Sequence, residues 1–304
     1  MKTISIMSML SVGLLLVLPL NGQTLNTLYS FGHNELGYQP YAITIGSSGQ
    51  IFGTSPNGGA YGYGVVFELA PPSAQGGAWS YSVLHSFNPQ NGETWPPAGN
   101  SLTLGPSGLV YGVAGGYGTD YGVVYRLVPP SAPSTQWHEN TLLALPTDLS
   151  GGATPEGALS IGPQGALYGS AGGGGAYSGG VVFRLSPPAS EGSTWTEQVL
   201  YNFNRAIGDG TAPFGPLTSG SDGAIYGVTK YGPSVSMFSS VYQLVPPGTA
   251  AGVWSESVLY SFSGSPQFLG FPNGVIMGPG GVLYGTAAGF RALAETMPPG
   301  LCSN

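Results

Sequence analysis

The sequence has few charged residues and almost no cysteine or histidine. Asp, Glu, Lys and Arg make up 6% of its 304 residues, against roughly 25% in ordinary globular proteins. Its one Cys, Cys302, cannot form an intramolecular disulfide, and no two of its three His have metal-ligand spacing. We therefore expect a fold that is stabilised by packing alone, and we predict no metal site and no cofactor.

Basic residues are too few and too scattered to form a nucleic-acid-binding surface. Six Lys and Arg stand against thirteen Asp and Glu, which gives a net charge of −7. The basic residues beyond position 22 are Arg126, Arg184, Arg205, Lys230 and Arg291. Binding to phosphates needs several clustered cations, so the sequence excludes nucleic acid as a partner.

Long apolar runs are also absent, except for one at the N-terminus. Ile4–Leu20 is a mainly apolar stretch of 17 residues, and Lys2 precedes it. A positive start and an apolar core are typical of a secretory signal peptide, and the stretch is short for a membrane span of about 20 residues. We predict that residues 1–22 are a cleaved signal peptide, so that the protein is secreted or held in the cell envelope without a membrane span. An uncleaved anchor is the alternative.

A repeat fills most of the remaining chain. An aromatic residue followed by Gly recurs at Phe52, Tyr111, Tyr168, Tyr226 and Tyr284, at intervals of 59, 57, 58 and 58 residues. Each of the first four pairs is followed by a Gly-rich connector, a segment such as Gly-Val-Val-Phe, a Pro-Pro pair and a Trp. A fixed period signals one repeat architecture, although the length alone would predict about two domains.

Each repeat contains four short segments that favour β-strands. In the third repeat these segments are 159–162, 166–171, 180–185 and 197–203. Four antiparallel strands in a period of about 58 residues are typical of a β-propeller blade. The density of Gly and Pro excludes a two-helix repeat. We predict an all-β fold, a β-propeller of about five blades over residues 23–287, with four complete blades and an incomplete fifth.

The two ends of the repeat region do not complement each other fully. Thr27–Phe31 matches the fourth strand of the repeat, whereas the fifth blade has first and second strands but no third strand. We predict that Thr27–Phe31 lies beside Leu283–Thr286 and gives a three-stranded blade, or that the ring stays open there. Residues 288–304 abandon the repeat, and we expect an irregular tail.

These residues resemble the bacterial choice-of-anchor tandem-repeat proteins, whose signature is called the GloVer repeat. The signature is matched by Gly281–Thr286, Gly180–Phe183 and Val258–Phe262, and the resemblance covers about residues 25 to 287. It implies an exported, bacterial, propeller-like protein, often with a C-terminal surface anchor, but no sorting motif follows Thr286. The family implies no activity and no catalytic residues.

The residues themselves give no sign of a catalytic site. The first strands contain no Asp, Glu, His, Lys or Arg, so paired carboxylates for glycoside hydrolysis would have to come from loops. The acidic loop residues share no register, and the Gly172–Gly175 run lacks the Lys-Ser/Thr of a phosphate loop. We predict a non-catalytic binding or scaffold module. A glycan-active propeller enzyme that uses loop carboxylates is the alternative.

The long connectors between repeats carry the candidate binding residues. In a propeller, the connectors between the second and third strands and between consecutive blades emerge at one face. The aromatic residues expected there are Tyr38, Trp95, Tyr117, Tyr121, Tyr177 and Tyr231. Such side chains offer apolar area with a polar handle, which suits recognition of a glycan or a surface protein. The alternative is that they pack the loops down. We interpret Trp79, Trp137, Trp195 and Trp254 as structural.

Overall fold

The structure is a computed structural model that is built almost entirely of β-strands. It describes residues 25–32, 37–88, 102–115, 121–190, 193–234, 237–249, 252–263, 271–288 and 301–302. These residues contain no α-helix, only short 3-10 turns such as η2 (Pro106–Gly108), η3 (Pro163–Gly165), η4 (Arg205–Ile207) and η6 (Pro279–Gly281). None of the described residues forms a helix long and apolar enough to cross a membrane. The predicted all-β class is confirmed.

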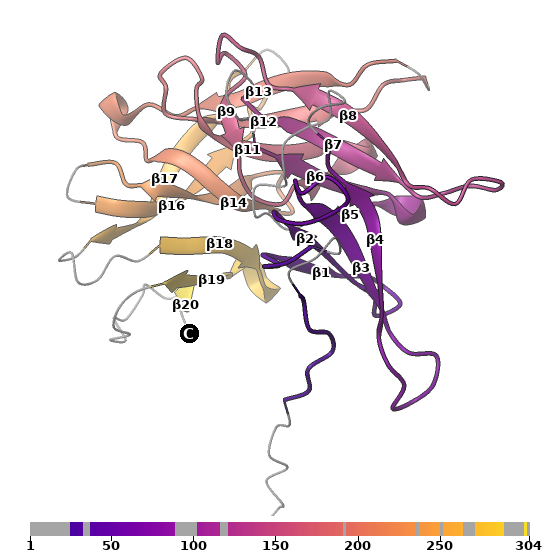
Figure 1. Ribbon diagram of the computed structural model, residues 1–304. Helices are drawn as coiled ribbons and strands as arrows, with labels where there is room; N and C mark the ends of the chain where they lie inside the picture. The colour runs from indigo at the N-terminus through magenta and orange to yellow at the C-terminus, as the bar shows by residue number, and fades with distance from the viewer. Residues whose placement is uncertain are drawn as a thin grey trace, which may run out of the picture.

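The strands form five sheets that follow one another along the chain (Figure 1). The first sheet contains β1 (Ile43–Ile45), β2 (Ile51–Ser55), β3 (Val65–Ala70) and β4 (Ser80–Ser86). The second contains β5 (Thr103–Leu104), β6 (Val110–Ala114), β7 (Val123–Val128) and β8 (His138–Ala144). The third contains β10 (Ser160–Ile161), β11 (Leu167–Gly173), β12 (Val181–Ser186) and β13 (Thr196–Asn202), and β9 (Ala153–Pro155) also pairs with β11.

The fourth and fifth sheets have longer first strands than the sequence predicts. The fourth sheet contains β14 (Thr211–Ser219), β15 (Ile225–Tyr231), β16 (Met237–Val245) and β17 (Ser255–Ser263). The fifth contains β18 (Phe271–Met277), β19 (Leu283–Ala288) and β20 (Leu301–Cys302). In these two sheets, residues that the sequence assigns to the connector before the first strand extend that strand. The pairing with the second strand then contains register shifts.

Consecutive sheets are joined at their first strands by side-chain hydroxyl groups. The Thr44 hydroxyl donates to the Leu102 carbonyl at 2.6 Å, and the same bond recurs one repeat later each time. The other donors are Thr103, Ser160 and Thr218, which bond the carbonyls of Leu159, Leu217 and Val275. First strands of neighbouring sheets are therefore adjacent, as expected of the innermost strands of a propeller. Ile276 occupies the donor position in the fifth sheet.

Apolar side chains fill the contacts between consecutive sheets, which we call seams. In the seam between the third and fourth sheets, Val182 and Phe203 pack against Ile225, Tyr242 and others, and Trp254 lies against the same cluster. Trp137 and Trp195 contact the two preceding seams. Their structural interpretation therefore holds, because each Trp covers a buried apolar cluster.

The Gly of each aromatic-Gly pair makes room for an aromatic ring. Gly169 in β11 pairs with Phe183 in β12, and a Cβ on Gly169 would lie 2.5 Å from Cζ of Phe183. From the sequence, this Gly favours a close approach of neighbouring backbones. In the structure its closest neighbours are side chains, so the third-strand ring is the main reason for the Gly.

The N-terminal segment covers the outer face of the first sheet. Tyr29 stacks on Tyr81 with 4.7 Å between ring centroids, and Phe31 lies 5.1 Å from Phe67. Residues 27–31 form no strand, and it is β20 that pairs with β19, in parallel. The alternative in which Thr27–Phe31 lies beside Leu283–Thr286 is therefore wrong, whereas the other alternative, a ring that stays open there, stays a prediction.

The C-terminal tail is described only in part. β20 falls within residues 288–304, where the sequence predicts irregular structure. Only residues 288, 301 and 302 of that segment are described. The prediction for the tail as a whole, like the predicted signal peptide at residues 1–22, concerns mainly residues outside the described ranges.

Candidate functional site

The connectors after the second strand and after the fourth strand leave each sheet at the same end. In the first sheet, Val65 pairs both with Ser55, the last residue of β2, and with Ser86, the last residue of β4. The same arrangement is found in the third sheet, where Val181 pairs with Ala171 and Asn202. The described candidate aromatic residues belong to segments at this end, which we call the connector end.

The six candidate aromatic residues fall into three groups. Tyr177 and Tyr231 are 60% and 55% exposed. Tyr38 is half-buried and forms a bridge with Asn57, and Tyr121 packs against the seam between the second and third sheets. Trp95 and Tyr117 lie outside the described residues. Packing of the loops therefore explains Tyr121, whereas Tyr177 and Tyr231 present their rings to solvent.

Tyr177 and Tyr231 are linked through strand β14. The connector carrying Tyr177 is hydrogen-bonded to the fourth sheet, because the Ala212 amide donates to the Gly179 carbonyl at 2.8 Å. Thr211, the residue before Ala212, pairs with Tyr231 across β14 and β15. Both exposed rings therefore stand at the connector end of the third and fourth sheets.

A buried carboxylate fixes the chain beside these two rings. Asp209 is buried, and its Oδ2 accepts hydrogen bonds from the Tyr201 hydroxyl at 2.8 Å and from the Asn204 amide at 2.9 Å. Burial, followed by these contacts with Asp209, raises the pKa of Tyr201, so its hydroxyl stays a donor at any physiological pH. The connector that contains η4 is thereby held in one conformation.

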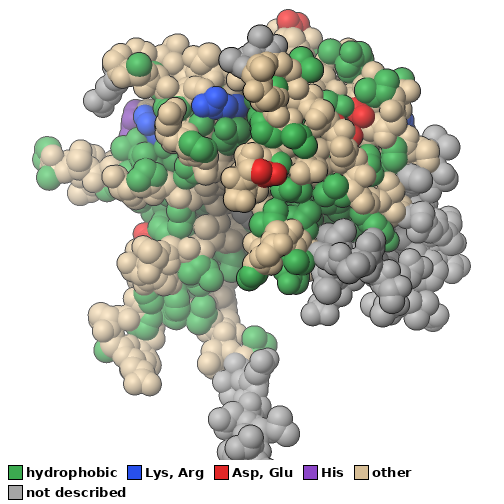
Figure 2. All heavy atoms as spheres, turned by 180° about the vertical axis from the view of Figure 1, so that it is seen from behind, with side chains coloured by type: hydrophobic (Ala, Val, Ile, Leu, Met, Phe, Trp, Pro, Cys, Tyr) green, Lys and Arg blue, Asp and Glu red, His purple; other side chains and the backbone are tan. Residues whose placement is uncertain are grey.

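Two cationic side chains border the same region. Arg205 donates through Nη2 to the Gly232 carbonyl at 3.3 Å, directly after Tyr231. Lys230 forms an ion pair with Glu156 and lies 5.6 Å from the centroid of the Phe214 ring. Charged groups are otherwise sparse, as the face in Figure 2 shows. We call Tyr177, Arg205, Lys230 and Tyr231 the tyrosine rim.

One glutamate near this region has a strongly shifted pKa. Burial raises the pKa of Glu256 to about 7, and the charge of Asp209 adds to the shift. Glu139 and Glu197 occupy the same position in the fourth strands of the second and third sheets, and burial also raises the pKa of Glu197. A residue that recurs in three seams has the placement of a structural group. A prediction from loop carboxylates misses this position, because these Glu residues lie within strands.

His85 is packed, as the sequence predicts. His85 in β4 lies 4.9 Å from the Phe87 ring, and its Nε2 is 3.9 Å from Oε2 of Glu139. Within the described ranges, no three His, Cys, Asp or Glu side chains gather in a way that could hold a metal ion.

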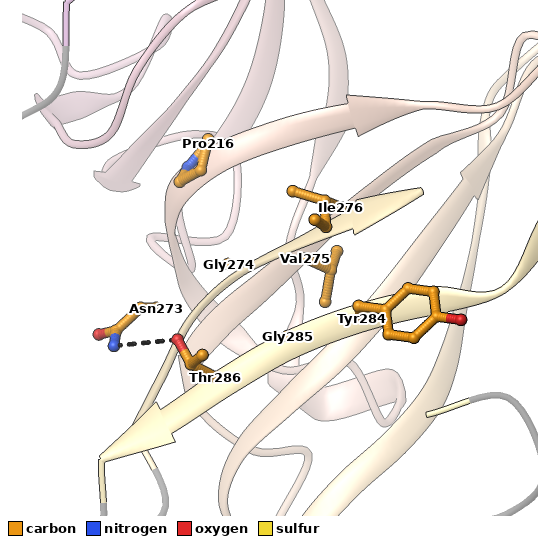
Figure 3. A pocket seen from close by; sticks show the side chains of 8 residues that line it. All are labelled: Pro216, Asn273, Gly274, Val275, Ile276, Tyr284, Gly285 and Thr286. Carbon is orange, nitrogen blue, oxygen red and sulfur yellow. Dashed lines mark hydrogen bonds between the residues drawn. The ribbon is translucent and has the colours of Figure 1, made fainter. Parts of the chain in front are cut away.

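The structure also contains a pocket that the sequence does not indicate. It has a volume of about 450 Å³ and lies along β18 and β19 beside Pro216 of β14 (Figure 3). The other lining residues are Asn273, Gly274, Val275, Ile276, Tyr284, Gly285 and Thr286. Its one internal side-chain hydrogen bond is long, from Asn273 Nδ2 to Thr286 Oγ1 at 3.4 Å. The walls are mainly apolar.

Comparison with known proteins identifies the family. Residues 80–293 match the Gloeobacter/Verrucomicrobia repeat. Because the match covers most of the chain, the protein belongs to the Gloeobacter/Verrucomicrobia repeat family, as the GloVer resemblance predicts. No curated protein matches the chain.

Solved structures agree with a propeller-like fold. The PQQ-bound aldose sugar dehydrogenase of Streptomyces coelicolor is 14% identical with a TM-score of 0.53, covering 87% of this chain and 77% of its own. The α-L-arabinanase of Penicillium chrysogenum with arabinobiose is 14% identical with a TM-score of 0.44, covering 79% and 70%. The likeness to the dehydrogenase concerns the fold alone at this identity, and the arabinanase, with a TM-score below 0.5, carries no argument. The predicted propeller class is confirmed, and the number of blades stays a prediction.

Proposed function

We propose that the protein is an exported, non-catalytic binding module that holds a carbohydrate at the tyrosine rim. The observation that carries the proposal is the pair of exposed tyrosines. Tyr177 lies on a connector that is hydrogen-bonded to β14, and Tyr231 is the last residue of β15, which pairs with β14. Export rests on the apolar segment of residues 1–22. The natural ligand is a glycan, either free or on a cell-surface protein.

The chemistry of the rim suits a sugar. A tyrosine ring packs against the C–H face of a pyranose, and its hydroxyl exchanges hydrogen bonds with ring substituents. Arg205 adds a cationic donor next to Tyr231, where it bonds the Gly232 carbonyl. The buried Asp209 holds the neighbouring chain in place before any ligand arrives, which lowers the entropy cost of binding.

A non-catalytic role fits the acidic groups better than hydrolysis does. A glycosidase needs two carboxyl groups that both reach the scissile bond. Asp209 is buried and already accepts hydrogen bonds from Tyr201 and Asn204. Glu256 belongs to a set that recurs in three seams. The rim therefore supplies contacts for holding a sugar, and we assign no residue of it to bond cleavage.

A glycan-array screen of the full chain, followed by titration of the best glycan, tests the proposal. We expect Tyr177→Ala and Tyr231→Ala each to weaken binding about tenfold, which is about 1.4 kcal/mol. Tyr61→Ala is the matched control. Tyr61 occupies the repeat position of Tyr177 in the first sheet and is 54% exposed. The second sheet, which follows the first, has Gly116 at the repeat position of Tyr231, so Tyr61 has no second tyrosine there to form a pair. We therefore expect Tyr61→Ala to bind like the wild type.

Two results would contradict the proposal. One is an array without hits for the folded chain. The other is a glycan that binds equally well to the wild type and to both rim variants. A hydrolysed glycan with Glu256→Gln inactive would instead favour the enzyme alternative.

A further inference from the structure

Four of the five sheets share a slot that is filled by an aromatic ring. In each, the Gly of the second strand lies opposite an aromatic residue of the third strand. The pairs are Gly53 with Phe67, Gly112 with Tyr125, Gly169 with Phe183 and Gly227 with Tyr242. A Cβ on any of these Gly residues would meet the ring at 2.5 Å or less. The repeat therefore places an aromatic side chain of the third strand opposite the Gly of the second strand.

In the fifth sheet, no described residue places a ring in the slot. Gly285 in β19 is the fifth member of the set, and the nearest atom to a Cβ there is the Gly274 carbonyl oxygen, at 2.8 Å. β20 pairs with β19 only at Leu283 and Tyr284, so within the described chain the outer edge at 285–287 has no strand partner. Gly285 and Thr286 are also walls of the pocket of about 450 Å³ (Figure 3).

The seam between the fourth and fifth sheets contains one of the two aromatic residues that form a recurring contact in the other seams. In the seam between the third and fourth sheets, the ring of Phe203, which follows β13, lies 4.9 Å from the ring of Tyr242 in β16. Phe87 lies 5.5 Å from Tyr125 in the same way. Phe262 is the equivalent residue of the fourth sheet and packs against the apolar cluster that contains Leu283. This cluster is continuous with the slot at Gly285.

We propose that the edge of β19 binds an extended segment of a partner protein by strand addition. The segment has the pattern Val-Val-aromatic-x-Leu, runs antiparallel to β19 and places its aromatic ring over Gly285 against Phe262. Main-chain hydrogen bonds provide the affinity, and the slot provides the specificity. The residue opposite Tyr284 is polar, as Arg184 is opposite Tyr168. β20 leaves the edge when the segment binds.

The segment comes from another protein because this chain has no described third strand to spare. β3, β7, β12 and β16 are each paired on both sides. The Val residues at the start of β3 and β12 are fully buried. If a third strand left its own sheet to bind β19 of a second copy, one complete sheet would be broken for each incomplete sheet that is completed.

Titration calorimetry of the full chain with a synthetic peptide tests the proposal. The probe copies residues 180–187, Gly-Val-Val-Phe-Arg-Leu-Ser-Pro. We expect saturable binding of one peptide, at least tenfold weaker when its Phe is replaced by Ala and changed less than about twofold when its Arg is replaced by Ala. No heat at about 1 mM peptide, or equal binding of the Phe and Ala peptides, would overturn the proposal.

Two protein variants test the location of the site. Gly285→Ala narrows the slot, and we expect it to lose the peptide. Gly248→Ala is the matched control, because a Cβ there meets nothing within 4 Å, and it keeps wild-type binding. Sedimentation of the peptide-free chain supplies the last outcome. A dimer that Gly285→Ala abolishes would show that a second copy occupies the edge, and the proposal would fail.

Discussion

At the scale of single residues, the glutamates in the seams make the stability of the fold depend on pH. Glu139, Glu197 and Glu256 face the preceding sheet from the same position of the fourth strand. Within the described part of the chain, Oε1 of Glu197 and of Glu256 are buried without a hydrogen-bond partner. A carboxylate in that situation binds a proton more tightly in the folded than in the unfolded state.

Glu256 provides the first stability prediction. Its pKa is about 7 in the folded protein and about 4.5 as the ordinary value, so its contribution to stability is complete below pH 4.5. That contribution is lost as the pH rises through 7. Glu256 is only partly buried, so we expect a small effect, with Glu256→Gln raising Tm by ~2 °C at pH 8 and leaving it unchanged at pH 4. Scanning calorimetry at the two pH values measures this, and an equal change at both would contradict it.

At the scale of elements, the hydroxyl bonds between first strands are the repeated joint of the fold. Thr218 connects β14 to the carbonyl of Val275 in β18. Removing the hydroxyl leaves that carbonyl without its donor, which costs about 1 kcal/mol. We expect Thr218→Val to lower Tm by ~2–4 °C.

The control for this variant is Thr196→Val at the exposed start of β13. It makes the same change of side chain away from a seam, so thermal unfolding should show almost no effect. Equal Tm values for the two variants would mean that the hydroxyl bond contributes nothing to stability.

The strands were predictable from the sequence because their signals are local. Alternating β-branched and aromatic residues with Gly turns at a fixed period define β11 and β12 within two residues. The hydroxyl joints were not predictable, because Ser160 looks like any other residue of a short strand. Their partners lie 56 to 58 residues away, so only the spatial neighbour identifies them.

The candidate site was predictable only in part for the same reason. Connector position and residue type selected Tyr177 and Tyr231, which are exposed. The same criteria selected Tyr121, whose ring packs against a seam that the sequence does not display. Tyr61 shares the register and exposure of Tyr177 and could have been found from the repeat alone. Asp209 was seen as a loop charge, but its buried hydrogen bonds depend on Tyr201.

At the scale of the whole molecule, the first and last sheets end the series differently. Tyr111 is 6% exposed within a seam, whereas its equivalent in the fifth sheet, Tyr284, is 40% exposed and the neighbouring Ile276 is 65% exposed. The first sheet is covered by the N-terminal segment, whose Tyr29 and Phe31 repeat the edge-to-face arrangement of Tyr201 and Phe203. The segment thus replaces the outer strand of a preceding sheet.

This replacement gives the last prediction. Phe31 contacts Phe67 and Tyr81, so Phe31→Ala removes the ring that covers β3 and β4. We expect a loss of about 1–2 kcal/mol, less than for a fully buried Phe because Phe31 is half-buried. Each sheet of a repeat protein contacts only the sheets next to it. Exchange of backbone amide hydrogens should therefore become faster in the first sheet and stay unchanged in the third and fourth. Leu28→Ala, which is 42% exposed in the wild type, is the control. Uniformly faster exchange would show that the sheets unfold as one unit, and unchanged exchange would show that the segment does not protect the first sheet.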